Sequence, residues 1–273
     1  MNRSALGGIF ALAVLLFSVA ATGGQAQEVI LIEDDFTNSA GDMPNETEDS
    51  SPIGGDRTTL DCVWQSNGCC HNVFDGVTNL EMPFDGNWSS YIDSRQCGAG
   101  DDIVAGVAYA LTVVFTAGPN EGGNMTMGWA ESGDWGQNSG GDTLRLAVIG
   151  PDGSLLVHPG PGANHDLTPA IDTGTDVVRG VPQSVGLLIG TDGVISVYYA
   201  NGIEKNWNYS ASAWTDVTPS GIPNMAEGSN MVGLNPADDN GNDDPFLVDY
   251  FALVENPEMG PVPNEVMRWS LYD

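Results

Sequence analysis

The stretch from Val185 to Tyr209 constrains the fold more than any other part of the chain. It holds three short runs rich in Val, Ile, Leu and Tyr, separated by the turn signals Gly190-Thr191-Asp192-Gly193 and Asn201-Gly202. Asn-Gly is the preferred dipeptide of a two-residue type I′ hairpin turn. The middle run alternates between two faces, with Ile195, Val197 and Tyr199 on one and Val194, Ser196 and Tyr198 on the other. We therefore expect a meander of three antiparallel strands with one buried face.

Further short strands are expected on both sides of this meander, between turn signals such as Gly118-Pro119 and Asp152-Gly153. Their expected ranges are Val29 to Phe36, Tyr109 to Thr116, Asn124 to Glu131, Thr143 to Ile149 and Phe246 to Glu255. The 273 residues include 36 Gly and 16 Pro, and no long apolar run with a helical period follows the N-terminal segment. This pattern predicts one all-β domain, a two-sheet antiparallel β-sandwich of jelly-roll type.

The charge balance narrows the choice of partners. Asp and Glu number 37 against 7 Lys and Arg, which gives a formal net charge of −30, and Lys205 is the only lysine. A field of this sign repels phosphate backbones and anionic lipid heads, so neither nucleic acid nor a membrane surface is expected as a partner. Solubility in a salty setting accounts for the acidity, and recruitment of divalent cations is the functional alternative.

The N-terminal segment resembles an export signal. Arg3 precedes an apolar run from Ile9 to Val19, and small residues follow up to Gln25-Ala26-Gln27. We expect residues 1–27 to be a signal peptide, residues 28–256 the sandwich, and residues 257–273 a tail containing proline. A retained membrane anchor is the alternative, but the apolar run is shorter than the roughly 20 residues that span a bilayer. The mature chain is therefore expected at the cell surface or outside the cell, without insertion in a membrane.

The expected export of the chain bears on the state of its cysteines. Cys62, Cys69, Cys70 and Cys97 are the only four in the chain. An even number in an exported chain favours two disulfides, for which three pairings are possible. Because adjacent cysteines bond each other only with strain, we favour one of Cys69 and Cys70 bonding to Cys62 and the other to Cys97. A metal site that adds His71 is the alternative, with spacing unlike that of structural zinc sites.

The order of these features resembles the concanavalin A-like, laminin G-like sandwich family. The resemblance rests on an opening strand that ends in Asp34-Asp35-Phe36, on the pattern from Asp192 to Gly202, and on a closing strand with Val248-Asp249-Tyr250. It covers roughly residues 28 to 256 and implies that the first and last strands lie together and that a smooth sheet carries sugar or polymer ligands. The family includes lectins, hydrolases, lyases and adhesion domains, so the fold alone does not choose a function.

Aromatic side chains beside amides and acids favour a carbohydrate site. Sugar rings stack on aromatic faces and form hydrogen bonds with amide and carboxylate groups. The candidates are Trp129, Glu131, Arg145, Tyr198, Asn206, Trp207 and Asn208. Trp135, Tyr209 and Trp214 are expected to gather with them. Among all of these, Trp207 between its two asparagines is the one expected to be exposed, while core packing is the alternative for each.

Calcium is the expected cofactor, with two candidate positions. Asp238, Asn240, Asn242 and Asp244 alternate in an acidic loop before the closing strand, although the loop lacks the glycine and glutamate positions of an EF-hand. Asp34, Asp35 and Asp249 form the second position if the first and last strands pair, since carboxylates brought together favour a bound cation. A solvated acidic turn is the alternative at the loop.

These observations predict an exported, non-catalytic carbohydrate-binding or adhesion domain that calcium braces, with a polysaccharide or glycan as its partner. One alternative is a polysaccharide lyase or glycoside hydrolase of the same fold. The E-x-D-x-x-E pattern of retaining glycosidases is absent, however, and positive groups that could neutralise a uronate are scarce. The other alternative is a structural, self-associating surface protein.

Overall fold

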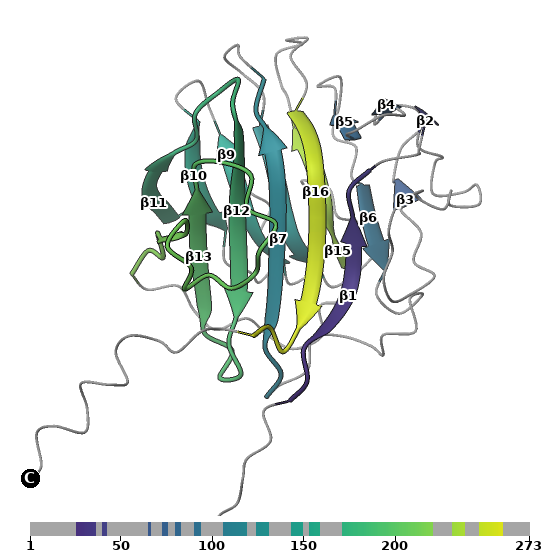
Figure 1. Ribbon diagram of the computed structural model, residues 1–273. Helices are drawn as coiled ribbons and strands as arrows, with labels where there is room; N and C mark the ends of the chain where they lie inside the picture. The colour runs from purple at the N-terminus through teal and green to yellow at the C-terminus, as the bar shows by residue number, and fades with distance from the viewer. Residues whose placement is uncertain are drawn as a thin grey trace, which may run out of the picture.

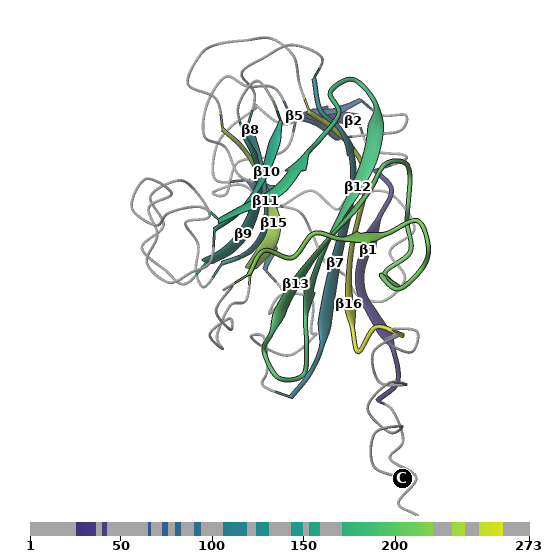
Figure 2. The same ribbon diagram turned by 90° about the vertical axis from the view of Figure 1, so that its left-hand side faces the viewer.

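The computed structural model describes residues 26–36, 40–42, 65–66, 73–75, 80–82, 90–93, 106–118, 124–130, 143–149, 153–158, 171–220, 231–237 and 246–258. These residues form two antiparallel sheets that pack face to face, as the edge-on view shows (Figures 1 and 2). No helix occurs among them. The protein is thus an all-β, two-sheet antiparallel sandwich, as the sequence predicts.

The nine-stranded sheet contains the meander and both ends of the sandwich. Its strands, in order, are β14 (Thr215–Asp216), β13 (Ile195–Ala200), β12 (Pro182–Ile189), β7 (Tyr109–Thr116), β16 (Phe246–Glu255), β5 (Leu80–Met82), β4 (Val73–Asp75) and β2 (Ala40–Asp42), and β1 (Val29–Asp34) also pairs with β16. Val29 lies opposite Glu255 and Asp34 opposite Phe251, so the first and last strands are neighbours, as the family resemblance implies.

The seven-stranded sheet forms the other layer. Its order is β11 (Ile171–Asp176), β10 (Ser154–His158), β9 (Thr143–Ile149), β8 (Asn124–Ala130), β15 (Met231–Ala237), β6 (Ser90–Asp93) and β3 (Gln65–Ser66). The strands β7, β9 and β16 have the bounds expected from the sequence.

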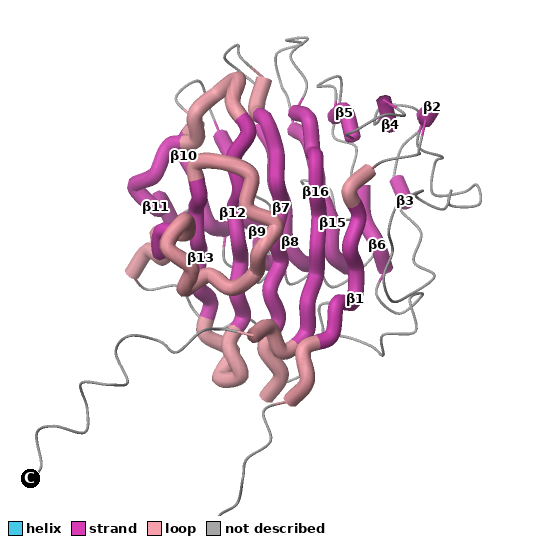
Figure 3. Tube along the Cα trace, in the orientation of Figure 1, coloured by secondary structure: helices cyan, strands magenta, loops and turns pink. Residues whose placement is uncertain are grey.

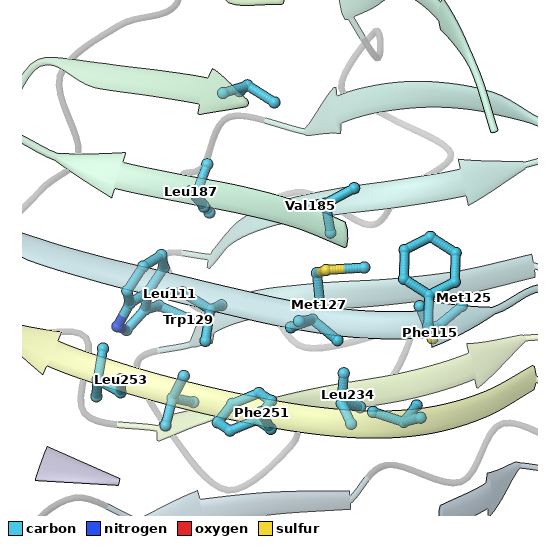
Figure 4. Close-up of a cluster of buried hydrophobic side chains, with 14 of the residues drawn as sticks. Leu111, Phe115, Met125, Met127, Trp129, Val185, Leu187, Leu234, Phe251 and Leu253 are labelled. Atoms are coloured by element: carbon cyan, nitrogen blue, oxygen red, sulfur yellow. The ribbon is translucent and has the colours of Figure 1, made fainter. Parts of the chain in front are cut away.

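The core lies between the two sheets and follows the period-2 pattern of the strands. Alternate residues of each long strand point inward and bury their apolar atoms, which drives the sheets together. Figure 4 shows this layer, to which the strands contribute Leu111, Phe115, Met125, Met127, Trp129, Val185, Leu187, Leu234, Phe251 and Leu253. The prediction for the middle run of the meander is confirmed: Ile195 and Val197 are in this core, Tyr199 packs against it, and Tyr198 lies on the opposite face.

The prediction of a third strand in the meander is wrong. After Asn201-Gly202 the chain forms no strand until Thr215, and among the described residues only Thr215 and Asp216 pair with β13 on that side. Residues 201–214, here called the strap, instead lie over the face of the nine-stranded sheet that points away from the core, here called the outer face (Figures 2 and 3). The physical reason is that Tyr209 and Trp214 bury their rings there, which an exposed edge strand would not allow.

Candidate functional site

Small side chains on the outer face make room for the strap. One cross-strand row runs from β13 to β1 through Tyr198, Gly186, Thr112, Ala252 and Glu33, which lie opposite one another in register. A Cβ atom at Gly186 would lie 2.3 Å from a ring carbon of Tyr209. Only glycine therefore leaves space for this ring, and the row works as a shallow channel that the strap fills.

Tyr209 anchors the strap at the middle of the sheet. Its hydroxyl donates to the backbone oxygen of Leu111 at 2.7 Å and lies 2.9 Å from Thr112 Oγ1, which then donates to it. The ring stacks on Tyr198 with centroids 4.6 Å apart and meets the edge of Trp214 at 5.0 Å. Burial raises the pKa of Tyr209 well above its usual range. The ring is only 2% exposed, so it acts as an internal anchor.

Two further contacts hold the strap at its flanks. Near its start, Ser184 Oγ donates to Gly202 O at 2.6 Å and accepts from the backbone N–H of Glu204. Near its end, Trp214 Nε1 donates to the backbone oxygen of Asn206 at 2.8 Å. These hydrogen bonds hold the strap in place over this part of the outer face.

The strap reaches the first and last strands through a basic and an aromatic residue. Lys205 Nζ lies 4.9 Å from the ring centroid of Tyr250, a cation–π contact. Tyr250 Oη donates to Glu33 Oε1 at 2.6 Å. Burial raises the pKa of Tyr250, and the neighbouring carboxylate of Glu33 raises it further. Trp207 packs over Tyr250, Val114 and Ala252.

Glu28 joins three distant parts of the chain at the end of the sheet. Its Oε2 accepts from Trp207 Nε1 at 2.8 Å and from the backbone N–H of Glu258 at 2.6 Å. These partners are separated from Glu28 by 179 and 230 positions in the sequence. Glu28 thus ties the strap and the chain after β16 to the segment that precedes β1.

An open pocket of about 890 Å³ lies at this end of the sheet, here called the strand-end pocket. It is found where β1 and β7 begin, where β16 ends, and at the turn between β12 and β13, the lower end in Figure 1. Its hydrogen-bonding side chains are Gln27, Glu28, Thr191, Asn208, Asn256 and Glu258. Small residues complete it, namely Ala26, Gly106, Ala108 and Pro257.

The structure divides the expected carbohydrate-binding residues into groups. Tyr198, Asn206, Trp207 and Asn208 gather on or beside the strap, and Tyr209 and Trp214 join them as expected. Asn208 also lines the strand-end pocket. Trp207 is half-buried and not fully exposed, because its indole ring packs on the outer face while its N–H binds Glu28.

The prediction that Trp129 belongs to a carbohydrate site is wrong. It is 2% exposed and lies in the core between the sheets, so a sugar cannot stack on it. The reason is visible in the sequence: Met125, Met127 and Trp129 alternate along β8, and all three point inward. Arg145 lies in β9 opposite Gly128 and His158. Glu131 and Trp135 lie outside the described residues.

The expected calcium residues are partly described. The pairing of β1 with β16 brings Asp34, Asp35 and Asp249 to one end of these strands. Asp34 is 1% exposed, and its Oδ1 accepts from the backbone N–H of Phe36 at 2.7 Å, in a turn that ends β1. Within the described residues, no three His, Cys, Asp or Glu side chains come together as a metal-ligand set, so the expectation that Asp34, Asp35 and Asp249 form a calcium position is wrong. Asp238, Asn240, Asn242 and Asp244 lie outside the described residues.

Two other expectations fall on parts of the chain that the structure does not describe. Cys62, Cys69, Cys70 and Cys97 all lie there, as do residues 1–25 of the expected signal peptide. The disulfides and the signal peptide stay predictions. No helix in the described part of the chain is long and apolar enough to cross a membrane.

Sequence reasoning missed most of the strand-end pocket. Glu28, Thr191, Asn256 and Glu258 carry no motif, and only folding brings them together. One signal was nevertheless present. Because the first and last strands were expected to be neighbours, the residue before one strand lies beside the residue after the other, which places Glu28 near Asn256.

Comparisons with known proteins give a likeness in fold. No protein-family model and no curated protein matches the chain. Among solved structures, it is similar to the carbohydrate recognition domain of Emp46p in its metal-free form, with 11% identity and a TM-score of 0.47 over 78% of this chain and 94% of the other. The exoplasmic/lumenal domain of VIP36, bound to Ca²⁺ and Man3GlcNAc, gives 11% identity and a TM-score of 0.48 over 75% and 87%.

A third similar structure is an uncharacterised protein from Mycobacterium paratuberculosis, with 14% identity and a TM-score of 0.47 over 82% of this chain and 99% of the other. Because the identities are this low and the TM-scores are below 0.5, no residue role passes from these proteins to this chain.

Proposed function

We propose that this protein is an exported, non-catalytic carbohydrate-binding protein whose sugar site is the strand-end pocket beside Trp207. The observation that carries the proposal is the gathering of five hydrogen-bonding side chains of the expected mature chain around an open space of about 890 Å³, next to a tryptophan that Glu28 holds in place. Pockets for small ligands are usually about 300 to 1,000 Å³ and combine a few polar groups with apolar or aromatic surface.

The chemistry of the pocket wall suits the hydroxyl groups of a sugar. Amides of Asn208 and Asn256 offer both donors and acceptors, the carboxylates of Glu28 and Glu258 accept, and Thr191 does either. In the described part of the chain, the side chains of Thr191 and Glu258 take part in no hydrogen bond with protein atoms. They are therefore available to a ligand without loss of an internal contact.

Calcium is the second part of the proposal. The candidate ligands are Asp238, Asn240, Asn242 and Asp244, which alternate in the acidic segment immediately before β16. A cation that binds the folded state alone raises the midpoint of thermal unfolding. We expect millimolar calcium to raise the melting temperature of the wild type, chelator to reverse the rise, and Asp244→Asn to reduce it. An unchanged melting temperature with calcium contradicts this part.

Calorimetric titration with a panel of neutral mono- and oligosaccharides tests the sugar site. We expect dissociation constants from about micromolar to millimolar, or roughly 4 to 8 kcal/mol. Thr191→Val keeps the shape of the side chain and removes its hydroxyl, so affinity should fall about 5- to 10-fold, the effect of one hydrogen bond of about 1 kcal/mol. Thr215→Val, on β14 and outside the pocket lining, is the matched control and should bind as the wild type does. Absence of binding across the panel overturns the proposal.

A further inference from the structure

We propose that the strand-end pocket binds the end of a glycan chain, and that the end it accepts is neutral or carries an amino group, with acidic sugars excluded. This inference rests on the proposed function and deepens it, because it names the class of ligand. Two independent observations carry it: the covering of the outer face by the strap, and the charge of the pocket wall.

The strap leaves no path for a polymer across the middle of the outer face. Tyr209 fills the channel over Gly186 and is 2% exposed, and Trp214 closes over Tyr209. Trp207 continues this cover toward Tyr250. A glycan that lay across β12, β7 and β16 would have to displace a segment held by hydrogen bonds to Thr112, Leu111 and Ser184.

The strand-end pocket lies beyond the edge of this cover and has walls from separate chain segments. The segment before β1 supplies Glu28, the turn between β12 and β13 supplies Thr191, and the chain after β16 supplies Asn256 and Glu258. Asn208 of the strap forms the side toward the covered face. A space bounded by the strap on one side and by strand ends elsewhere fits a terminal sugar unit better than the middle of a chain.

The charge of the wall selects among terminal units. Among the described residues from Glu28 on, the side chains of the lining include two carboxylates, Glu28 and Glu258, and no Lys, Arg or His. Oε2 of Glu28 already accepts two hydrogen bonds, whereas among described residues its Oε1 accepts none. Like charges in a partly enclosed site repel strongly, so a uronate or sialate is rejected, whereas hydroxyl and ammonium donors are accepted.

The length arm of the test uses neutral β-glucan, mannan and N-acetylated chitin oligosaccharides from one to six units, titrated calorimetrically against the full protein. For the series that binds, we expect molar affinity to change less than threefold from the disaccharide to the hexasaccharide, and the monosaccharide to compete fully for the site. Affinity that rises tenfold or more with length shows binding along a surface. That result overturns this inference and leaves the proposed sugar binding standing.

The charge arm compares deacetylated glucosamine oligomers with galacturonate oligomers of equal length. We expect the galacturonate oligomers to bind at least 30-fold more weakly. Glu258→Gln should narrow this difference at least fivefold, since the exposed Glu258 side chain makes no internal hydrogen bond among the described residues. Asp176→Asn, an exposed carboxylate on β11 of the other sheet, is the control and should leave the ratio unchanged. Equal binding of both oligomers overturns the charge selection, and binding of no glycan overturns the proposed function itself.

Discussion

The core between the sheets and the layer under the strap are both closely packed, but different rules build them. The core uses aliphatic and aromatic side chains at alternate strand positions, such as Val113, Leu187 and Phe251, whose contacts need little direction. In the second layer the strap itself supplies Tyr209, Trp207 and Trp214, and each of these directs its polar atom to a named acceptor.

This difference has a consequence for tolerance to change. Apolar cores accept many substitutions of similar volume, because hydrophobic contacts are not directional. A layer of tyrosine and tryptophan over a glycine depends on one geometry, since each buried hydroxyl or indole N–H left without a partner costs free energy. We therefore expect the core to determine whether the protein folds and the strap layer to determine the shape of the strand-end pocket.

The largest effect is expected in the core, with Phe251→Ala. Phe251 is 0% exposed and packs between the sheets from β16, so its removal leaves a cavity. Substitutions of this kind cost about 3 to 5 kcal/mol in the free energy of unfolding. Chemical denaturation followed by tryptophan fluorescence measures the change. A loss below about 1 kcal/mol would show that β16 is not the centre of the core.

Gly186→Ala should have the next largest effect and act on the strap. The added methyl group would lie 2.3 Å from the ring of Tyr209, which is held between Tyr198 and Trp214 and cannot rotate away. We expect a loss of about 1 to 3 kcal/mol, the usual range for overpacking.

The same methyl group should do little harm when the Tyr209 ring is gone. In the background Tyr209→Ala, Gly186→Ala should cost less than about 0.5 kcal/mol, because contacting residues are not additive. The double-mutant cycle from denaturation curves measures this. Equal costs of Gly186→Ala in both backgrounds would contradict the placement of the strap over this glycine.

The sequence predicted the core far better than the strap. Strand periodicity was enough for β7, β9 and β16 and for the inward positions of Ile195 and Val197, because burial on one face imposes a period of two. Asn201-Gly202 was a misleading signal. The dipeptide favours a hairpin locally, but the burial of Tyr209 over Gly186 outweighs that preference, and such a contact between distant residues has no pattern in the sequence.

The candidate site was predicted in part for the same reason. Trp207 and Asn208 were identified because they adjoin each other in an aromatic and amide-rich segment, and both lie at or beside the strand-end pocket. Glu28, Thr191 and Glu258 come from different chain segments, so their meeting depends on strand pairing. Trp129 was misassigned because composition was given more weight than its position in the alternation of β8.

Alkaline pH should reveal the two buried tyrosines on the outer face, Tyr209 and Tyr250. Burial raises the pKa of both Tyr209 and Tyr250 in the folded state, whereas in the unfolded state each has a pKa of about 10. The stabilising effect is therefore complete below about pH 10 and is lost as pH rises above it, since the unfolded chain then releases protons that the folded protein retains. The expected loss is up to about 1.4 kcal/mol per pH unit for each tyrosine.

Denaturation curves between about pH 9 and pH 11 measure this slope. Tyr209→Phe should remove the share of Tyr209 and leave that of Tyr250, and Tyr250→Phe should do the converse. Tyr199→Phe is the control, because Tyr199 is only half-buried, so a smaller change in slope is expected even though burial also raises its pKa. A slope that none of these substitutions alters would assign the alkaline unfolding to the net negative charge.

The smallest effect on stability is expected at the contact between the strap and the N-terminal segment. Trp207→Phe keeps an aromatic ring over Tyr250 and removes only the N–H that Glu28 accepts at 2.8 Å. Because this hydrogen bond is partly exposed, we expect a cost of about 1 kcal/mol, or about 2 to 4 °C in melting temperature for a domain of this size.

Glu28→Ala removes the same bond from the other side, together with the bond to the backbone of Glu258. If the bond couples the strap to the pocket wall, the double variant should lose less than the sum of the single losses, by about 0.5 to 1 kcal/mol. Calorimetric melting of the four proteins measures this difference. Strict additivity would mean that Glu28 and Trp207 act independently, and the strap would then have no influence on the pocket through this contact.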